Sequence, residues 1–212
     1  MIIKLRQWYD NWKIELSEHK YLILVSLMFL VFANIINVYA GNYVDSKDAI
    51  PVKDIILDNI PTINLELLFS YGMIFFLSVL LFYVLFFRVK QFHTVAFSFS
   101  TLILVRSFFI TLTHLGKPSD AAIMTSLPGI YQALNFHNDL FFSGHAALPF
   151  MAFLIFRKEK IGPFFLFMTI LLSFTVLVMH LHYSIDVFAA FFITYALYIF
   201  SQWFSGKYFS KR

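Results

Sequence analysis

Long apolar stretches alternate with short polar segments along the chain, and six of these stretches approach the thickness of a bilayer. Their approximate limits are residues 21–39, 65–87, 94–115, 140–156, 161–179 and 185–204. A helix needs about 20 apolar residues to cross the hydrocarbon core of a membrane. The pattern therefore predicts an all-α fold, a polytopic membrane protein with six transmembrane helices. The fourth and fifth helices are the least separated, because only RKEK and a Gly-Pro pair divide them.

The first 20 residues follow a different pattern. Aromatic and leucine side chains recur at helical spacing among charged residues, at Leu5, Trp8, Tyr9, Trp12 and Leu16. This spacing predicts an amphipathic helix that lies in the membrane interface, with tryptophan at the level of the lipid headgroups. We therefore expect an interfacial helix over residues 1–20, a six-span membrane domain over 21–206 and a cytoplasmic tail over 207–212.

The composition also indicates a membrane protein. The chain is 60% hydrophobic and 13% charged, whereas soluble domains contain roughly 45–50% apolar and about 25% charged residues. There are no cysteines, which excludes disulfides and thiolate-ligated metal sites.

The charged residues predict the orientation of the helices. With the N-terminus in the cytoplasm, all 16 lysines and arginines fall on the cytoplasmic side except Lys47, Lys53 and Lys117 in outer loops and Arg106 within a span. Cytoplasmic enrichment of lysine and arginine is the general rule for membrane proteins. Both termini are therefore expected in the cytoplasm. The net charge of +4 is expected to contact the anionic inner leaflet, with no nucleic-acid partner.

This topology brings two polar clusters to one membrane level. The fourth and sixth spans both enter the bilayer from outside, so NDLFFSGH and HLHYSID are expected together on the extracytoplasmic side. His182 and Asp186 are four residues apart and share one helical face. Asp186 can accept the Nδ1 proton of His182 and leave Nε2 free to attack an electrophile.

The SGH tripeptide suits a phosphate group. Ser143 and Gly144 fall in the first turn of the fourth span, where backbone N–H groups bind anions and glycine permits close approach. His145 then lies beside the bound group and can protonate a leaving oxygen. Arg106 lies in the outer half of the third span, where a guanidinium group suits phosphate oxygens. A structural ion pair with Glu66 is the alternative role for this arginine.

Each of these signals also has an ordinary structural explanation. A single histidine at a membrane interface is more often simply hydrated, a His-x-x-x-Asp pair is common on helices, and SGH is short. The functional interpretation rests on both clusters reaching the same side of the membrane.

These segments resemble the signature motifs of the sphingomyelin synthase family, a branch of the type-2 phosphatidic acid phosphatase superfamily. NDLFFSGH matches a pattern with an aspartate, Asp139, four residues before Ser143. HYSIDVFAAFFIT matches His-Tyr-Thr-x-Asp-Val, with serine in place of threonine. His180 also fits, because such proteins often read His-x-His-Tyr, and RSFFITLTHL resembles a more variable motif that contains arginine. The resemblance covers roughly residues 100–200.

The chain departs from these patterns at several positions. Ala146 replaces the threonine that commonly follows SGH, and His137 and Asn138 replace a Cys-Gly pair. Thr175 and Val176 occupy the places of a Ser-Arg pair in the broader phosphatase pattern, and the sequence has no Lys-x6-Arg-Pro motif. The missing cations would normally bind a doubly charged phosphomonoester, so their loss favours a singly charged phosphodiester.

The resemblance implies six spans, an outward-facing site and a reaction in two displacements. His182, oriented by Asp186, attacks the phosphorus of a phospholipid and forms a phosphohistidine. His145 protonates the departing diacylglycerol and then deprotonates the acceptor. The residues expected to contact the substrate are Arg106, Asp139, Ser143, Gly144, His180 and Tyr183. No metal or other cofactor is implied.

The acceptor decides the activity that the resemblance implies. A lipid alcohol gives a phosphotransferase, which is the leading interpretation, and water gives a lipid phosphate phosphatase, which is the alternative.

Two unrelated classes of membrane protein fit the sequence less well. A haem-binding electron carrier would place histidine pairs at two depths. The histidines expected on the outer side are His114, His137, His145, His180 and His182. A transporter would show internal repeats or interrupted spans, and neither is visible in the sequence.

Overall fold

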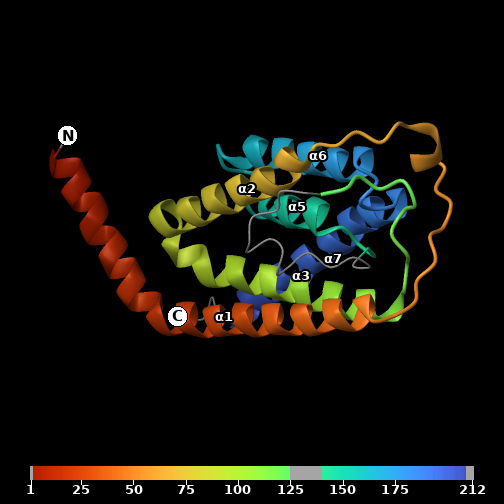
Figure 1. Cartoon of the computed structure of the whole chain (residues 1–212). Coiled ribbons are helices and arrows are strands. Elements are labelled where there is room, and N and C mark those ends of the chain that lie inside the picture. Colours follow the sequence, from red (N-terminus) through yellow and green to blue (C-terminus); the bar gives the residue numbers. More distant parts are fainter. Residues whose placement is uncertain (1, 125–139, 209–212) are drawn as a thin grey trace.

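The protein is described by a computed structural model over residues 2–124 and 140–208, and every regular element in these residues is a helix (Figure 1). The α-helices are α1 (Ile2–Asp45), α2 (Glu66–Phe87), α3 (Phe92–Leu112), α5 (Gly144–Phe156), α6 (Gly162–Val178) and α7 (Ser184–Tyr208). Two short 3-10 helices, η1 (Leu57–Asn59) and η2 (Val89–Gln91), lie in connections. The predicted all-α fold is confirmed for this part of the chain.

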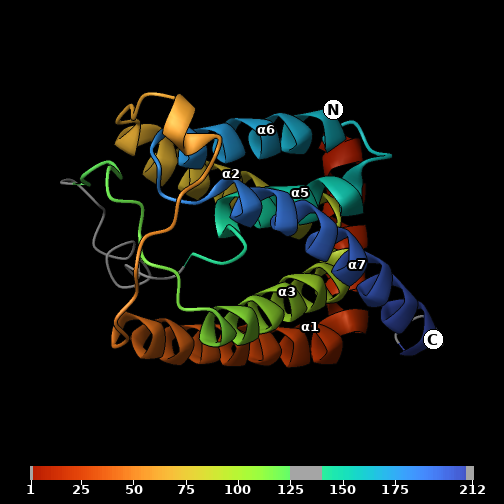
Figure 2. The ribbon, with the colours of Figure 1, turned by 90° about the vertical axis from the view of Figure 1, so that its right-hand side faces the viewer.

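The helices form two groups that α7 connects. α1 packs along α3, while α5 packs against both α6 and α7, and α2 packs against α6. α7 also contacts α3 and crosses the bundle obliquely (Figure 2). The largest buried cluster draws on five of these helices, with side chains such as Phe76, Leu102, Met151, Leu172 and Ala190.

Four helical segments are long and apolar enough to cross a membrane. They are Tyr9–Asp45, Glu66–Phe87, Val89–Leu112 and Ser184–Tyr208. Large apolar side chains on their outer faces are exposed, such as Tyr21 at 72% and Phe192 at 76%. Helices that are apolar all round suit a lipid environment, so these features support a membrane protein. α5 has 13 residues and α6 has 17, and the crossing of the bilayer by all six helices stays a prediction.

Two predicted boundaries differ from the structure. The predicted interfacial helix and the first span form one continuous helix, α1, whose N-terminal part turns away from the part beside α3 (Figure 1). The fourth span is predicted to begin at residue 140, but α5 begins at Gly144. Residues 140–143 instead form an irregular turn in which Phe142 has a φ of 50°.

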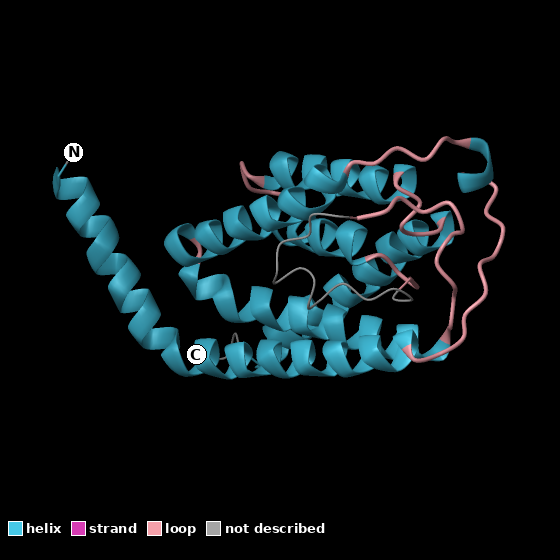
Figure 3. Ribbon diagram, viewed as in Figure 1, coloured by secondary structure: helices cyan, strands magenta, loops and turns pink. Residues whose placement is uncertain are grey.

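Connections gather at one end of the bundle and form what we call the cap, residues 46–65, 113–124 and 179–183 (Figure 3). Backbone hydrogen bonds attach both long loops to the end of α6. They run from the Ile63 N–H to the Val178 carbonyl and from the Ala122 N–H to the Met179 carbonyl, each at 2.9 Å. These bonds satisfy backbone groups that would otherwise be buried without partners, and they place the turn before α7.

Gly116 is required where the two long loops meet. Its N–H donates to the Ile50 carbonyl at 3.2 Å. A Cβ at Gly116 would lie 2.6 Å from the carbonyl carbon of Ile50. Only glycine allows backbones to approach this closely, so the loops pack through their main chains.

A charged cluster at the end of α2 distant from the cap joins this helix to the α5–α6 connection. Arg88 Nε donates to both carboxylate oxygens of Glu159 at 2.9 Å. The Tyr83 hydroxyl donates to Oε2 of the same carboxylate. The N-terminal part of α1 reaches this end too, because Trp12 Nε1 donates to the Leu85 carbonyl at 2.6 Å.

Candidate active site

His182 lies in the turn that precedes α7, and its side chain is buried. Its Nδ1 atom is 2.9 Å from the Leu140 carbonyl oxygen. A carbonyl oxygen only accepts hydrogen bonds, so Nδ1 carries the proton and Nε2 carries the lone pair. This is the tautomer that a nucleophilic Nε2 requires. The sequence did not identify Leu140 as the partner.

Asp186 supports the same segment from the first turn of α7. Its Oδ2 atom accepts the Tyr183 N–H at 2.9 Å and lies 3.6 Å from Nδ1 of His182. The carboxylate is fully buried, and its Oδ1 has no hydrogen-bond partner among the described residues. Asp186 therefore lies behind His182 as a buried negative charge, while the Leu140 carbonyl makes the close contact with Nδ1.

His145 lies on the first turn of α5 and stacks on an aromatic ring of α2. The ring centroids of His145 and Phe69 are 4.0 Å apart, with an interplanar angle of 20°. His182 and Arg106 both lie near His145. A backbone bond at 3.1 Å from the Ser143 N–H to the Asp186 carbonyl joins the start of α5, which carries His145, to the start of α7, just after His182.

The start of α5 leaves its first amides uncapped by any described side chain. Ser143 occupies the N-cap position with no side-chain capping bond, and its buried Oγ has no hydrogen-bond partner among the described residues. Its backbone N–H instead donates to the Asp186 carbonyl at 3.1 Å. Because the first N–H groups of a helix have no intrahelical acceptors, this turn can receive an anion.

Arg106 is buried on α3 and contacts the turn before α5. Its Nε donates to the Phe142 carbonyl at 3.0 Å, and a Cβ built on Gly144 would lie 3.6 Å from the same Nε. Phe142 is one of two non-glycine residues with positive φ in the described chain. This backbone conformation costs about 1–3 kcal/mol and persists only where the surrounding structure holds it. The bond from Arg106 stabilises this turn and sets a guanidinium group beside the SGH motif.

His180 and Tyr183 contact the cap. His180 is fully buried with a φ of 52°, and its Nδ1 lies 2.7 Å from Asp120 Oδ2 and 3.1 Å from Thr62 Oγ1. The Tyr183 hydroxyl donates to the Gly116 carbonyl at 2.7 Å and accepts the Val52 N–H at 3.0 Å. These two side chains attach the turn before α7 to both long loops.

The remaining predicted site residue, Asp139, lies outside the described residues. Within the described residues, no group of three or more His, Cys, Asp and Glu side chains is arranged to hold a metal ion.

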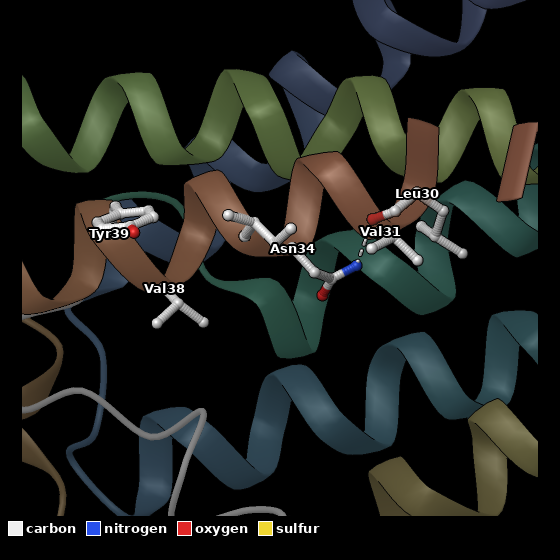
Figure 4. A pocket seen from close by; sticks show the side chains of 6 residues that line it. Leu30, Val31, Asn34, Val38 and Tyr39 are labelled. Carbon is white, nitrogen blue, oxygen red and sulfur yellow. Dashed lines mark hydrogen bonds between the residues drawn. The ribbon is translucent and has the colours of Figure 1, made fainter. Parts of the chain in front are cut away.

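An apolar groove lies along one face of α1 (Figure 4). Its lining residues are Leu30, Val31, Asn34, Ile35, Val38 and Tyr39, and its volume is ≈ 540 Å³. The adjacent Asn37 accepts a hydrogen bond from Ser107 of α3 at 3.3 Å. The groove therefore lies on the part of α1 that packs beside Ser107, the neighbour of Arg106.

Comparison with known families adds the deciding observation. Residues 138–203 match the family model described as PAP2 superfamily C-terminal, and this segment includes His145, His182 and Asp186. This segment is therefore similar to the C-terminal part of PAP2 proteins. Members of the PAP2 superfamily are phosphoesterases or phosphotransferases that act on lipid phosphates, so the match indicates that the protein is an enzyme. No curated protein matches the chain.

Proposed function

We propose that the protein moves a phospho-headgroup from a phospholipid to a lipid alcohol, through a phosphohistidine at His182. The proposal is supported above all by one arrangement: His182, with Nε2 as its lone-pair nitrogen, lies near His145 at the start of α5, where Ser143 makes no side-chain capping bond. The match of this segment to the PAP2 superfamily supports a lipid phosphate as substrate. The sphingomyelin synthase-like motifs favour transfer to a lipid over hydrolysis.

In the first displacement, Nε2 of His182 attacks phosphorus. An N–P bond forms while the bond from phosphorus to the diacylglycerol oxygen breaks. His145 must first take up a proton and then gives it to that oxygen, so diacylglycerol leaves as a neutral alcohol. The His182 ring becomes positively charged, because Nδ1 keeps its proton, and the buried carboxylate of Asp186 stabilises that charge.

Negative charge on the phosphoryl oxygens is balanced by donors at the start of α5. The backbone N–H groups of its first turn provide a positive helix end, and Arg106 adds a guanidinium group beside Gly144. These donors are held by the fold before the reaction begins, which is the main source of rate enhancement in phosphoryl transfer.

The second displacement reverses the roles of the two histidines. Neutral His145 takes the proton from the acceptor hydroxyl, whose oxygen attacks phosphorus. The N–P bond breaks, and its electron pair returns to Nε2 of His182. The new headgroup lipid then leaves. His145 now carries the proton taken from the acceptor and Nε2 of His182 has its lone pair again, so both histidines are ready for the next first displacement.

The site suits a singly charged phosphodiester. The PAP2 pattern normally adds cations shortly before the second histidine, but here Thr175 and Val176 stand in those places. Both are fully buried, and the Thr175 hydroxyl donates to the Leu171 carbonyl of its own helix at 2.8 Å. Neither side chain can neutralise a second negative charge on phosphate.

The groove on α1 suits an acyl chain of the lipid substrate. Its volume of ≈ 540 Å³ falls within the roughly 300–1,000 Å³ of ordinary ligand pockets. Apart from Asn34, its lining side chains are apolar, and Tyr39 carries a polar group only at its tip. We assign catalysis to the membrane domain over 21–206, with both termini cytoplasmic and the cap on the extracytoplasmic side.

Hydrolysis is the second candidate. Water in place of the lipid alcohol would use the same His145, His182 and Asp186 and would release phosphate or a phosphorylated headgroup. The match to a superfamily named for a phosphatase favours this activity.

Purified protein in detergent micelles tests both candidates. The substrates are phospholipids with a radiolabelled headgroup, supplied with and without ceramide. Transferase activity predicts a labelled ceramide product with release of diacylglycerol, whereas hydrolysis predicts water-soluble label in both samples.

His182→Ala and His145→Ala should each abolish turnover. His114→Ala, which changes an exposed histidine of the cap, should not. Unchanged turnover in His182→Ala removes this residue from the role of nucleophile.

A further inference from the structure

Asp54 is a buried carboxylate that lies far from the PAP2 segment in sequence. It belongs to the loop between α1 and α2, before η1, and its side chain is 9% exposed. The family match begins at residue 138, so Asp54 falls outside it. The sequence gives this residue no motif of its own.

Both oxygens of Asp54 are fully engaged, and they face different parts of the molecule. Oδ1 accepts the backbone N–H groups of Ile56 at 2.9 Å and Leu57 at 3.2 Å, which fixes the carboxylate in its own loop. Oδ2 accepts the backbone N–H of Ser184 at 2.7 Å and the Ser184 hydroxyl at 2.8 Å. One carboxylate therefore ties the α1–α2 loop to the first residue of α7.

The bonds to Ser184 act at the point where α7 begins. The first N–H groups of a helix lack intrahelical acceptors, and a negative charge there is favourable. Burial raises the pKa of Asp54, but hydrogen bonds from Ser184, Leu57 and Ile56 lower the pKa more, so the group is ionised at neutral pH. Asp54 thus caps α7 from another part of the chain.

Ser184 stands between the two catalytic side chains of this segment. His182 precedes it by two residues and Asp186 follows it by two. Asp186 accepts the N–H of the adjacent Tyr183, so consecutive amides at the start of α7 bond to two different carboxylates. The backbone that carries His182 is held from both sides.

A second link from the same loop reinforces this contact. The Val52 N–H donates to the Tyr183 hydroxyl at 3.0 Å. Loop residues 52 and 54 therefore hold neighbouring residues 183 and 184.

We propose that Asp54 is a positioning residue for the reaction: through Ser184 it fixes the first turn of α7 and hence the placement of His182 against the Leu140 carbonyl. This inference rests on the proposed function. It makes the loop between α1 and α2 part of the working enzyme, although only the C-terminal segment matches the family.

The test uses full-length protein with radiolabelled phosphatidylcholine, phosphatidylethanolamine or phosphatidic acid in mixed micelles. The variants are Asp54→Asn, Ser184→Ala and the double variant. Asp58→Asn is the matched control, because Asp58 is an exposed carboxylate of the same loop. Steady-state kcat and KM, the rate of His182 modification in a single turnover, and the folded fraction are measured for each.

Displacement of a reacting group by about 1 Å can lower a rate by roughly a hundredfold. Asp54→Asn should therefore lower kcat per folded enzyme by about ten- to one-hundredfold with KM within about twofold. Ser184→Ala, which keeps the backbone bond, should lower it by about tenfold or less. The double variant should be no slower than Asp54→Asn, because both changes act on one contact.

Wild-type kcat per folded molecule in Asp54→Asn would overturn the inference, even where less protein folds. Additive losses in the double variant would also overturn it, because the two residues would then act separately. If wild-type protein turned over none of the three lipids and formed no adduct, the proposed function itself would fail. Normal wild-type turnover with an unaffected Asp54→Asn would reject only the positioning role.

Discussion

In the proposed reaction, the reactivity of His182 depends on a backbone oxygen. The Leu140 carbonyl fixes the proton on Nδ1, so Asp186 is left mainly to stabilise the charge that develops on the ring. Catalytic triads in which a carboxylate alone sets the tautomer lose about 10⁴-fold in kcat when that carboxylate becomes an amide. A smaller loss is expected here because the carbonyl remains.

Asp186→Asn should reduce kcat by about 10- to 100-fold, which corresponds to about 1.4–2.7 kcal/mol of lost stabilisation of the transition state. The measurement is kcat on headgroup-labelled phospholipid, with the thermal unfolding temperature as a check on folding. A loss as large as that of His182→Ala would mean that Asp186 sets the tautomer. No loss at all would exclude any electrostatic role for the carboxylate.

From the sequence, the polar side chains of the candidate site are easier to predict than the groups that they contact. His145, His182 and Asp186 stand out because ionisable groups are rare within apolar stretches, and these three gather at the ends of two such stretches. The Leu140 and Phe142 carbonyls carry no signal in residue type, because every residue has a carbonyl. Phe69 and Asp54 come from distant segments, and their contacts depend on how α2 and the cap pack.

At the scale of single elements, α5 shows how hydropathy misplaces a helix start. The segment LFF before the SGH motif is as apolar as the helix that follows, so the pattern extends the span to residue 140. The structure begins the helix at Gly144, because the preceding backbone bonds instead to Arg106 and His182. Hydropathy cannot separate an apolar turn from an apolar helix. The observed lengths of α2 and α3, in contrast, agree closely with the apolar stretches predicted over 65–87 and 94–115.

The junction of α2 with the α5–α6 connection predicts a pH effect on stability. Burial raises the pKa of Glu159, but hydrogen bonds from Arg88 and Tyr83 lower it more, so its pKa lies below the ordinary value of 4.5. A lowered pKa means that the ionised form stabilises the fold. This contribution is complete above pH 4.5 and is lost as the pH falls through the lower, folded-state pKa.

Glu159→Gln should therefore lower stability by about 1 kcal/mol at pH 7, because Arg88 is partly exposed and solvent screens the pair. For a chain of this size the shift in unfolding temperature is about 2–4 °C. The difference between wild type and variant should shrink as the pH falls below 4.5. A difference that stayed constant down to pH 3 would assign the effect to packing instead of charge.

At the scale of the whole molecule, the cap joins parts of the chain that the sequence kept separate. The pattern predicted two long loops on the same side of the membrane, but it could not predict that Asp54, Gly116 and Asp120 contact the turn before α7. Those contacts depend on three-dimensional loop paths, which leave no periodic trace in sequence. The distribution of lysine and arginine, in contrast, predicts how the protein is oriented across the membrane, which the packing of helices alone does not.

The absence of cysteine allows that orientation to be tested without background. Lys53→Cys lies in the cap and Lys158→Cys in the α5–α6 connection, and both positions are exposed. In sealed, right-side-out vesicles, a membrane-impermeant maleimide should label Lys53→Cys, and it should label Lys158→Cys only after permeabilisation. The reverse pattern would put the site on the cytoplasmic side.

In the proposed mechanism one imidazole, that of His182, becomes covalently bound to the phosphorus of the lipid. The most direct measurement is an alkaline quench of purified enzyme during turnover, followed by peptide mass spectrometry, since N–P bonds to histidine survive base better than acid. We expect a phospho-headgroup adduct on the peptide that contains His182, absent in His182→Ala and slow to form in His145→Ala. An adduct on a different residue, or rapid turnover with no adduct and with inverted configuration at phosphorus, would contradict it.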